Sequence, residues 1–230
     1  MLSGRALAIE IVVVTAICLC LTLVNALLQP SGAPVSDIAW LAAICSLFAL
    51  PAVAVRYVHP RDEKSAGTAL EWSWPDLRYG LAISALLLVP VALGNHFARV
   101  GLSGMDFRFA WQNFGRMEMP FYYEIPIQFL CIALPEEFFY RGYLMTNLQK
   151  LLSGARSGAK YVPVAAIVIS SMIFALAHFP TGGAERLLTF FPGLLFGFIR
   201  YRTGGILGAA ACHAACNLMM VLYGVHYFVH

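Results

Sequence analysis

The sequence predicts an all-α, polytopic integral membrane protein, a helical bundle with about seven transmembrane helices and a range of six to eight. Of its 230 residues, 60% are hydrophobic and only 12% are charged. Soluble domains carry about 25% charged residues, so most of this surface is expected to face lipid. Seven apolar stretches also have roughly the 20 residues that a helix needs to cross the hydrocarbon core.

The seven predicted spans lie at about residues 7–28, 38–58, 77–98, 121–150, 162–179, 186–201 and 205–228. The first is too long for the core of a signal peptide and lacks a clear cleavage site, so we expect it to be retained. The fourth exceeds what a bilayer requires, and we expect it to project into the cytosol or to bend at Pro135. The sixth is short and contains Pro192 and Gly193, which predicts a tilted, kinked or partly inserted helix.

The loop charges predict a cytoplasmic N-terminus, because cytoplasmic loops carry an excess of Lys and Arg. In this orientation the outer cations are Arg99, Arg108, Arg116 and Arg186. The inner ones are Arg5, Arg56, Arg61, Lys64, Arg78, Lys150, Arg156, Lys160, Arg200 and Arg202. Three arginines of the 99–120 segment oppose this orientation. The formal net charge of +3, with no dense basic cluster, argues against a nucleic-acid partner.

Two loops and the domain organisation complete the outline. The 99–120 segment is compatible with an amphipathic lid in the membrane interface and equally with an ordinary loop that carries belt aromatics. Its large apolar residues are Met105, Phe107, Phe109, Trp111 and Phe114. The 59–76 segment is predicted to be a cytoplasmic hairpin without evident chemistry. No repeat or additional module is found, which predicts a single transmembrane domain over residues 1–230.

Three polar motifs interrupt the apolar helices. They are Glu136-Glu137-Phe-Phe-Tyr-Arg141, Phe174-Ala-Leu-Ala-His178 and His213-Ala-Ala-Cys-Asn217. Each contains a pair of residues four positions apart, which share one face of a helix. Ionisable residues at membrane depth are costly and face a bundle interior or a wet cavity, so each motif is a candidate functional site.

The two glutamates are predicted to have different roles. Adjacent side chains diverge by about 100° around a helix, so Glu136 and Glu137 cannot point at the same atom. Glu137 precedes Arg141 by four residues, the favourable order for an intrahelical salt bridge. Glu136 is then free to act as a general base. The alternative is that both acids pair structurally with Arg141 and with other basic residues.

The histidine motifs are weak when each is taken alone. His178 ends its apolar stretch, so an interfacial or capping role competes with catalysis, and Phe174 is expected to pack beside it. His213 and Asn217 lie among alanines, which also suits an inert packing face. Zinc bound by Glu136, His178 and His213 is a further alternative, although no HExxH motif is present.

Together, in this order and separated by apolar spans, the motifs resemble the CAAX protease and bacteriocin-processing (CPBP, or Abi) family of intramembrane endopeptidases. The resemblance covers about residues 120–220, the motif-bearing core. The matching residues are Glu136, Glu137, Arg141, Phe174, His178, His213 and Asn217. It implies a helical bundle with a cavity open to membrane and water. In it, Glu136 and His178 would activate the attacking water, and His213 and Asn217 would stabilise the oxyanion.

The resemblance further implies hydrolysis of a peptide bond near the C-terminus or membrane anchor of a membrane-associated protein. The partners would be that substrate and the lipid bilayer, and the compact size suits the bacterial branch and its inner membrane. We expect a glutamate-type enzyme without a cofactor, with zinc as the alternative. Two other functions compete, a non-catalytic bacteriocin self-immunity or scaffold protein and a small proton-coupled transporter. The transporter lacks support, because no repeated halves are found.

Overall fold

The computed structural model describes residues 2–29, 34–102, 104, 106–107, 121–155, 160–224 and 227–228. The α-helices are α1 (Gly4–Leu28), α2 (Pro34–Val53), α3 (Glu63–Ala66), α4 (Trp74–His96), α5 (Phe121–Pro126), α6 (Leu134–Glu137), α7 (Met145–Ala155), α8 (Val162–His178), α9 (Phe190–Thr203) and α10 (Leu207–Gly224). The π-helical segments are η2 (Ala54–Val58), η3 (Phe97–Leu102), η5 (Ile127–Ala133) and η6 (Phe138–Leu144), and the 3₁₀ segments are η7 (Phe179–Thr181) and η8 (Gly183–Thr189). Strands β1 (Asp106–Phe107) and β2 (Tyr227–Phe228) form one short antiparallel pair.

Helical structure occupies each of the seven predicted ranges, which confirms the fold class. Four described stretches are long and apolar enough to cross a membrane by length and composition, at Gly4–Leu28, Ser36–Val58, Trp74–Gly101 and Val162–Thr181. The other three ranges differ for physical reasons. The stretch from α5 to α7 carries the ionisable motif residues, α9 has only 14 residues, and Leu207–Tyr223 is a shorter apolar helix. Most of the predicted lid at 99–120 lies outside the described residues, and that prediction stays open.

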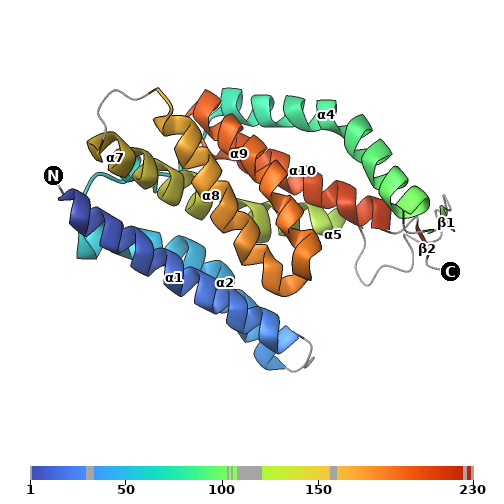
Figure 1. Ribbon diagram of the computed structural model, residues 1–230, viewed down its shortest axis with the longest axis horizontal. Helices are drawn as coiled ribbons and strands as arrows, with labels where there is room; N and C mark the ends of the chain where they lie inside the picture. Colours follow the sequence, from blue (N-terminus) through green and yellow to red (C-terminus); the bar gives the residue numbers. More distant parts are fainter. Residues whose placement is uncertain are drawn as a thin grey trace.

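The helices form a bundle with a separate N-terminal hairpin along one side (Figure 1). Helices α1 and α2 pair with each other to make this hairpin, and α8, α9 and α10 lie beside the stretch from α5 to α7. On the other side α4 packs against α10, where the two backbones approach closely. A Cβ atom on Gly80 would lie 2.0 Å from the carbonyl oxygen of Gly208, so this crossing requires glycine at position 80.

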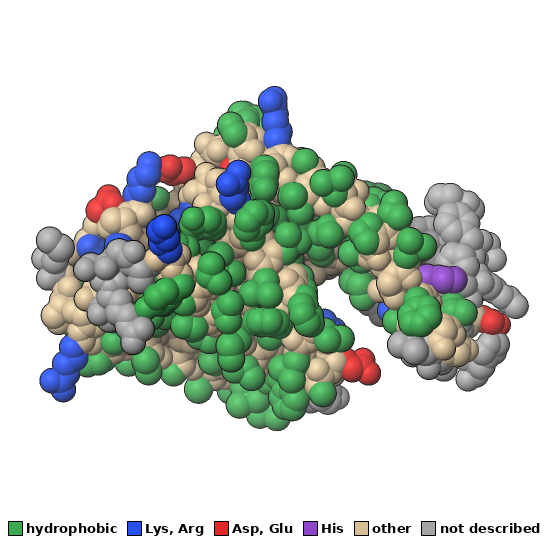
Figure 2. Space-filling model, turned by 45° about the horizontal axis from the view of Figure 1, so that its top comes forward, with side chains coloured by type: hydrophobic (Ala, Val, Ile, Leu, Met, Phe, Trp, Pro, Cys, Tyr) green, Lys and Arg blue, Asp and Glu red, His purple; other side chains and the backbone are tan. Residues whose placement is uncertain are grey.

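The surface of the bundle is largely apolar (Figure 2). Large hydrophobic side chains are exposed on α1, α4 and α9, among them Leu27 at 70%, Leu86 at 73% and Phe191 at 64%. Lys and Arg side chains lie mainly toward the left and top of the view. A continuous apolar surface of this extent needs lipid to cover it.

The 59–76 segment, predicted to be a hairpin without chemistry, docks through residues 59–67 onto the helix that carries the first motif. The carboxylate of Glu10 on α1 accepts hydrogen bonds from Tyr143 at 2.7 Å and from Arg61 Nη1 at 2.9 Å, and His59 Nδ1 lies 2.7 Å away. Asn147 Nδ2 donates to the carbonyl oxygen of Ala66 at 2.9 Å. These bonds hold both α1 and the 59–67 loop against the continuous helical stretch of residues 121–155, here called the motif helix.

The end of this loop has a conformation that requires glycine. Gly67 has φ of +77°, and a Cβ atom there would lie 2.0 Å from the carbonyl oxygen of Gly142. The left-handed conformation and the close approach both exclude a larger side chain. The loop therefore meets the motif helix backbone to backbone, one residue after Arg141.

Candidate active site

The two glutamates lie at the end of α6, between the π-helical segments η5 and η6. The backbone stays helical through Pro135, which neither ends the helix nor interrupts it, and continues to Ala155. Single π-helical turns occur often at functional sites because they change the direction in which neighbouring side chains point. Here Glu136 and Glu137 face different groups, as their adjacent positions predict.

Glu137 is the centre of a buried polar network. Its Oε1 atom accepts hydrogen bonds from Arg141 Nη1 and from His213 Nδ1, each at 2.9 Å. The side chains of Glu137 and Arg141 are 0% exposed, and that of His213 is 5% exposed. The predicted ion pair is therefore present, and His213 is an additional partner. A carboxylate only accepts hydrogen bonds, so Nδ1 of His213 carries a proton.

The guanidinium of Arg141 is enclosed by α9 and by aromatic rings. Its Nη2 atom donates to the carbonyl oxygen of Gly193 at 3.0 Å. The ring centroids of Phe174 and Phe196 lie 4.5 and 5.3 Å from its central carbon. Contacts of this kind stabilise a cation that is removed from water. A Cβ atom on Gly193 would lie 3.2 Å from Nη2, so this glycine, predicted only as a kink, makes room for Arg141.

Glu136 faces both histidines. Its Oε2 atom lies 3.9 Å from Nε2 of His178 and 3.8 Å from Nε2 of His213, and its side chain is 14% exposed. Both distances exceed a direct hydrogen bond and suit groups that share one bridging water or reacting atom. His178 Nδ1 donates to the carbonyl oxygen of Phe174 at 2.8 Å. Three helices thus bring a carboxylate and two imidazole Nε2 atoms together.

Aromatic rings hold the two imidazoles in place. Phe174 packs against His178 with ring centroids 4.5 Å apart and meets His213 edge to face at 5.7 Å. Phe196 stacks on His213 at 4.8 Å and 15°. The packing of Phe174 beside His178 agrees with the prediction. Phe196 was not predicted, because no local spacing distinguishes it from the other phenylalanines of α9.

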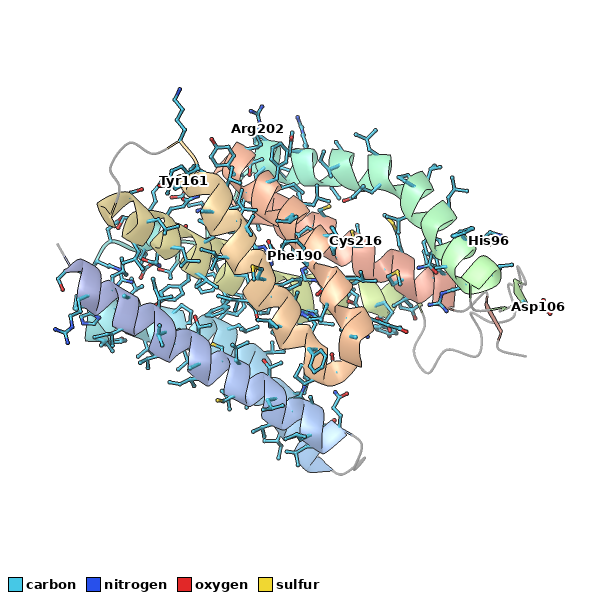
Figure 3. The ribbon with its side chains drawn as sticks, viewed as in Figure 1. His96, Asp106, Tyr161, Phe190, Arg202 and Cys216 are labelled. Carbon is cyan, nitrogen blue, oxygen red and sulfur yellow. The ribbon has the colours of Figure 1, made fainter. Side chains whose placement is uncertain are left out.

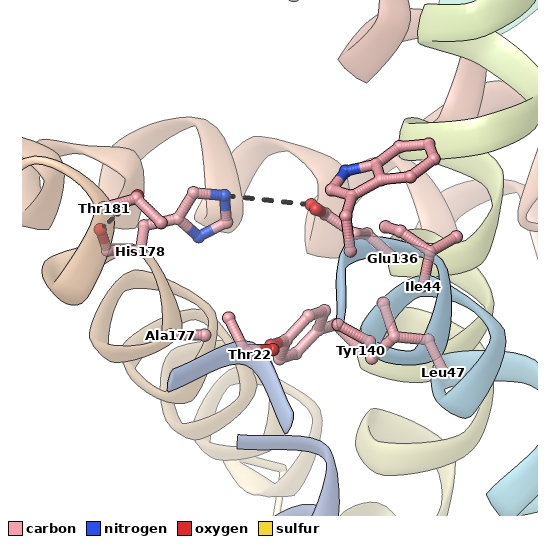
Figure 4. Close-up of a pocket in the computed structure, with 10 residues that line it drawn as sticks. Thr22, Ile44, Leu47, Glu136, Tyr140, Ala177, His178 and Thr181 are labelled. Carbon is pink, nitrogen blue, oxygen red and sulfur yellow. Dashed lines mark hydrogen bonds and ion pairs between the residues drawn. The ribbon is translucent and has the colours of Figure 1, made fainter. Parts of the chain in front are cut away.

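A pocket of about 100 Å³, large enough for several water molecules, lies beside Glu136 and His178 (Figure 4). The figure shows the two side chains facing each other across it, with Tyr140 below. Its other lining residues are Thr22, Trp40, Ala43, Ile44, Leu47, Ala177 and Thr181. Half of this lining comes from α1 and α2, which carry no motif. The contribution of the N-terminal hairpin to the pocket was therefore not predicted, because its sequence shows only a hydrophobic pattern.

Among the described residues, Asn217 is the predicted site residue for which no hydrogen bond or ion pair to the other six is found. It lies on α10, one turn after His213, and is half-buried. In the part of the chain that the structure describes, its side chain makes no hydrogen bond. No residue of α10 lines the pocket. The structure therefore brings together six of the seven predicted residues and leaves Asn217 on the same helix beside them.

A metal centre is not formed by the described residues, which contain no group of three His, Cys, Asp or Glu side chains arranged to hold an ion. Glu136, His178 and His213 include the ligand types that zinc prefers. Tetrahedral ligands at about 2.0–2.1 Å from zinc lie about 3.4 Å apart. The separations of 3.8 and 3.9 Å from Glu136 are wider.

Comparison with known proteins gives one match. Residues 118–219 match the family model described as type II CAAX prenyl endopeptidase, Rce1-like. The match covers somewhat less than half of the chain and contains all seven predicted site residues. Neither a curated protein nor a solved structure matches the chain. The pocket residues of α1 and α2 lie outside the matched range.

Proposed function

We propose that this chain, whose residues 118–219 belong to the Rce1-like family of type II CAAX prenyl endopeptidases, hydrolyses a peptide bond near the C-terminus or membrane anchor of a membrane-associated protein. The match over residues 118–219 and the apolar helices support an integral membrane protein of the CAAX protease family. The single observation that carries the proposal is the convergence of Glu136 with His178 and His213 beside a pocket.

The attacking water is activated by Glu136 and His178 in this proposal. Glu136 accepts a proton from the water as the water oxygen attacks the scissile carbonyl carbon. The protonated Glu136 then donates that proton to the leaving amine as the C–N bond breaks. The hydrogen bond from His178 Nδ1 to a backbone carbonyl directs Nε2 toward the water, where Nε2 acts as the acceptor in this proposal. Nε2 of His178 can therefore hold the same water in the orientation needed for attack. No metal ion takes part.

His213 and Asn217 stabilise the oxyanion. The carboxylate of Glu137 at Nδ1 fixes the orientation of the His213 ring and aims its Nε2 atom at the developing negative oxygen, to which an Nε2–H group donates in this proposal. Asn217, one turn further along α10, supplies a carboxamide N–H from the same helix face. The two histidines thus differ in role because their Nδ1 atoms have different partners.

Terminal proteomics tests this function. Bacterial cells that lack the chain are complemented with the wild type or with Glu136→Gln, and the termini of membrane proteins are compared. New termini within or beside a membrane anchor are expected only with the wild type. A Glu136→Gln variant that restores the wild-type phenotype without any change in termini would support the immunity or scaffold function instead. A proton-dependent solute uptake lost with Glu136 would support the transporter.

A further inference from the structure

The helices define two ends of the bundle. Chain direction alternates along the series α1, α2, α4, the continuous stretch from α5 to α7, α8, α9 and α10. The start of α1, the 59–67 loop and the ends of α7 and α9 therefore share one end, here called the N-terminal end. Figure 3 shows Tyr161 and Arg202 on this side of the molecule and His96 at the opposite extreme. The far end holds the end of α1, the end of α8 and the start of α9.

Positive charge is concentrated at the N-terminal end. The described cations there are Arg5, Arg56, Arg61, Lys64, Arg78, Lys150, Lys160, Arg200 and Arg202. In the described part of the far end the cations are Arg99 and Arg186. Short loops rich in Lys and Arg stay in the cytoplasm, so the N-terminal end faces the cytoplasm. The far end then faces the opposite side of the membrane.

The pocket lies toward the far end. His178 is the last residue of α8, and 16 steps of 1.5 Å put it about 24 Å from the start of that helix. His178 therefore lies at the far end of α8. The pocket rim is formed by Thr181, which is exposed, and by the half-buried Thr22 near the end of α1. Leu47 and Tyr140, exposed by only 5% and 3%, form its depth.

The cytoplasmic side of the pocket is closed. The next turn of the motif helix presents Tyr143 and Leu144, both 0% exposed, and Val55 opposite is also 0% exposed. Tyr143 is bound to Glu10, which Arg61 also contacts. This layer of packed side chains and hydrogen bonds separates Glu136 from the N-terminal end.

From these four observations we infer that the pocket opens to the extracytoplasmic side. Its substrates are membrane proteins whose scissile bond lies in the outer part of the bilayer or just outside it. The substrate class rests on the proposed peptidase function, whereas the direction of opening rests on geometry and charge alone. A polypeptide confined to the cytoplasm does not reach Glu136 by this route.

Cysteine labelling in intact cells tests the direction. Four single variants are compared with the unmodified chain, whose six cysteines set the background. Thr181→Cys reports the rim, and Lys64→Cys, at a side chain 74% exposed, reports the cytoplasmic loop. Ala177→Cys reports the pocket wall, and Ala175→Cys is its matched control, because Ala175 is equally buried on α8 but does not line the pocket. The probe is a small, charged methanethiosulfonate that does not cross membranes.

Thr181→Cys and Ala177→Cys are expected to react in intact cells, at least tenfold faster than Lys64→Cys. Lys64→Cys is expected to react only after permeabilisation, and Ala175→Cys in neither condition. The inference is overturned if Lys64→Cys reacts in intact cells while Thr181→Cys does not. It is also overturned if both variants react at the same rate. An unreactive Ala177→Cys beside a reactive Thr181→Cys also overturns it, because the pocket is then closed outward. Labelling needs no catalysis, so an inactive but outwardly labelled protein refutes only the proposed function.

Discussion

Glu137 and His213, 76 residues apart in the chain, are joined by a hydrogen bond of 2.9 Å between Oε1 and Nδ1. The same oxygen accepts from Arg141, so one buried carboxylate connects the motif helix with α10. A carboxylate on one imidazole nitrogen fixes the tautomer and orientation of the ring and thereby determines what the other nitrogen can do. Glu137 therefore has a role in aiming Nε2 of His213 besides neutralising Arg141.

Glu136→Gln is expected to lower the rate of cleavage by about 10²–10⁴-fold, because loss of a general base typically costs that much. Amounts in the membrane and behaviour in detergent should match the wild type, since Glu136 is not part of the Glu137 network. Glu124→Gln, in α5 near the start of the same helical stretch and outside the pocket lining, is the matched control and should stay active. Retention of more than about a tenth of the activity by Glu136→Gln would rule out the general-base role.

Arg141→Ala is expected to destabilise the protein as well as inactivate it. Removing one partner of a buried pair leaves an uncompensated charge and costs about 3–5 kcal/mol. The measurement is the thermal unfolding midpoint in detergent together with the yield, and Arg202→Ala, an exposed arginine on α9, serves as the control. An Arg141→Ala protein of normal stability and no activity would instead indicate direct binding of substrate.

Asn217→Ala is expected to reduce kcat by about 10²–10³-fold with little change in KM, because an oxyanion donor acts mainly in the transition state. Steady-state kinetics on a cleaved peptide substrate distinguish the two parameters. A defect confined to KM would contradict the assignment and would place the carboxamide in ground-state binding.

Exhaustive treatment with a strong chelator is expected to leave activity intact, and the purified protein should contain well under one equivalent of zinc. The separations of Glu136 from the two histidines are wider than those of tetrahedral zinc ligands, and asparagine is an unusual ligand for zinc. Elemental analysis and activity are measured on the same sample. Stoichiometric metal whose removal and return switch activity off and on would make His178 and His213 ligands.

Tyr143→Phe removes the hydroxyl that donates to Glu10 and is expected to cost about 1.5–3 kcal/mol, the range for a hydrogen bond to a charged group. The loss should appear as a lower unfolding midpoint. Tyr57→Phe, at a side chain 72% exposed, should leave the midpoint unchanged. Equal midpoints for both variants would mean that the Glu10 contact does not hold the hairpin to the motif helix.

The sequence allowed prediction of those features that depend on spacing within one helix. The Glu137–Arg141 pair and the contact of Phe174 with His178 each join residues four apart, and helix geometry alone brings them together. The bond between Glu137 and His213, the carbonyl of Gly193 on Arg141 and the pocket wall of Thr22 and Trp40 join different helices. Such contacts depend on how helices pack, and no local pattern in the apolar α1 and α2 indicates which face lines a pocket.

The close contact between Gly67 and Gly142 has a consequence for which glutamate does chemistry. Neighbouring positions on a helix differ by about 100° in rotation, so a slip of one residue would turn one glutamate into the direction that the other now has. The glycine contact and the bond from Asn147 to the Ala66 carbonyl hold the rotational register of this helix from outside. The different roles of these two chemically identical side chains therefore depend on a loop whose contacts lie further along the helix, at Gly142 and Asn147.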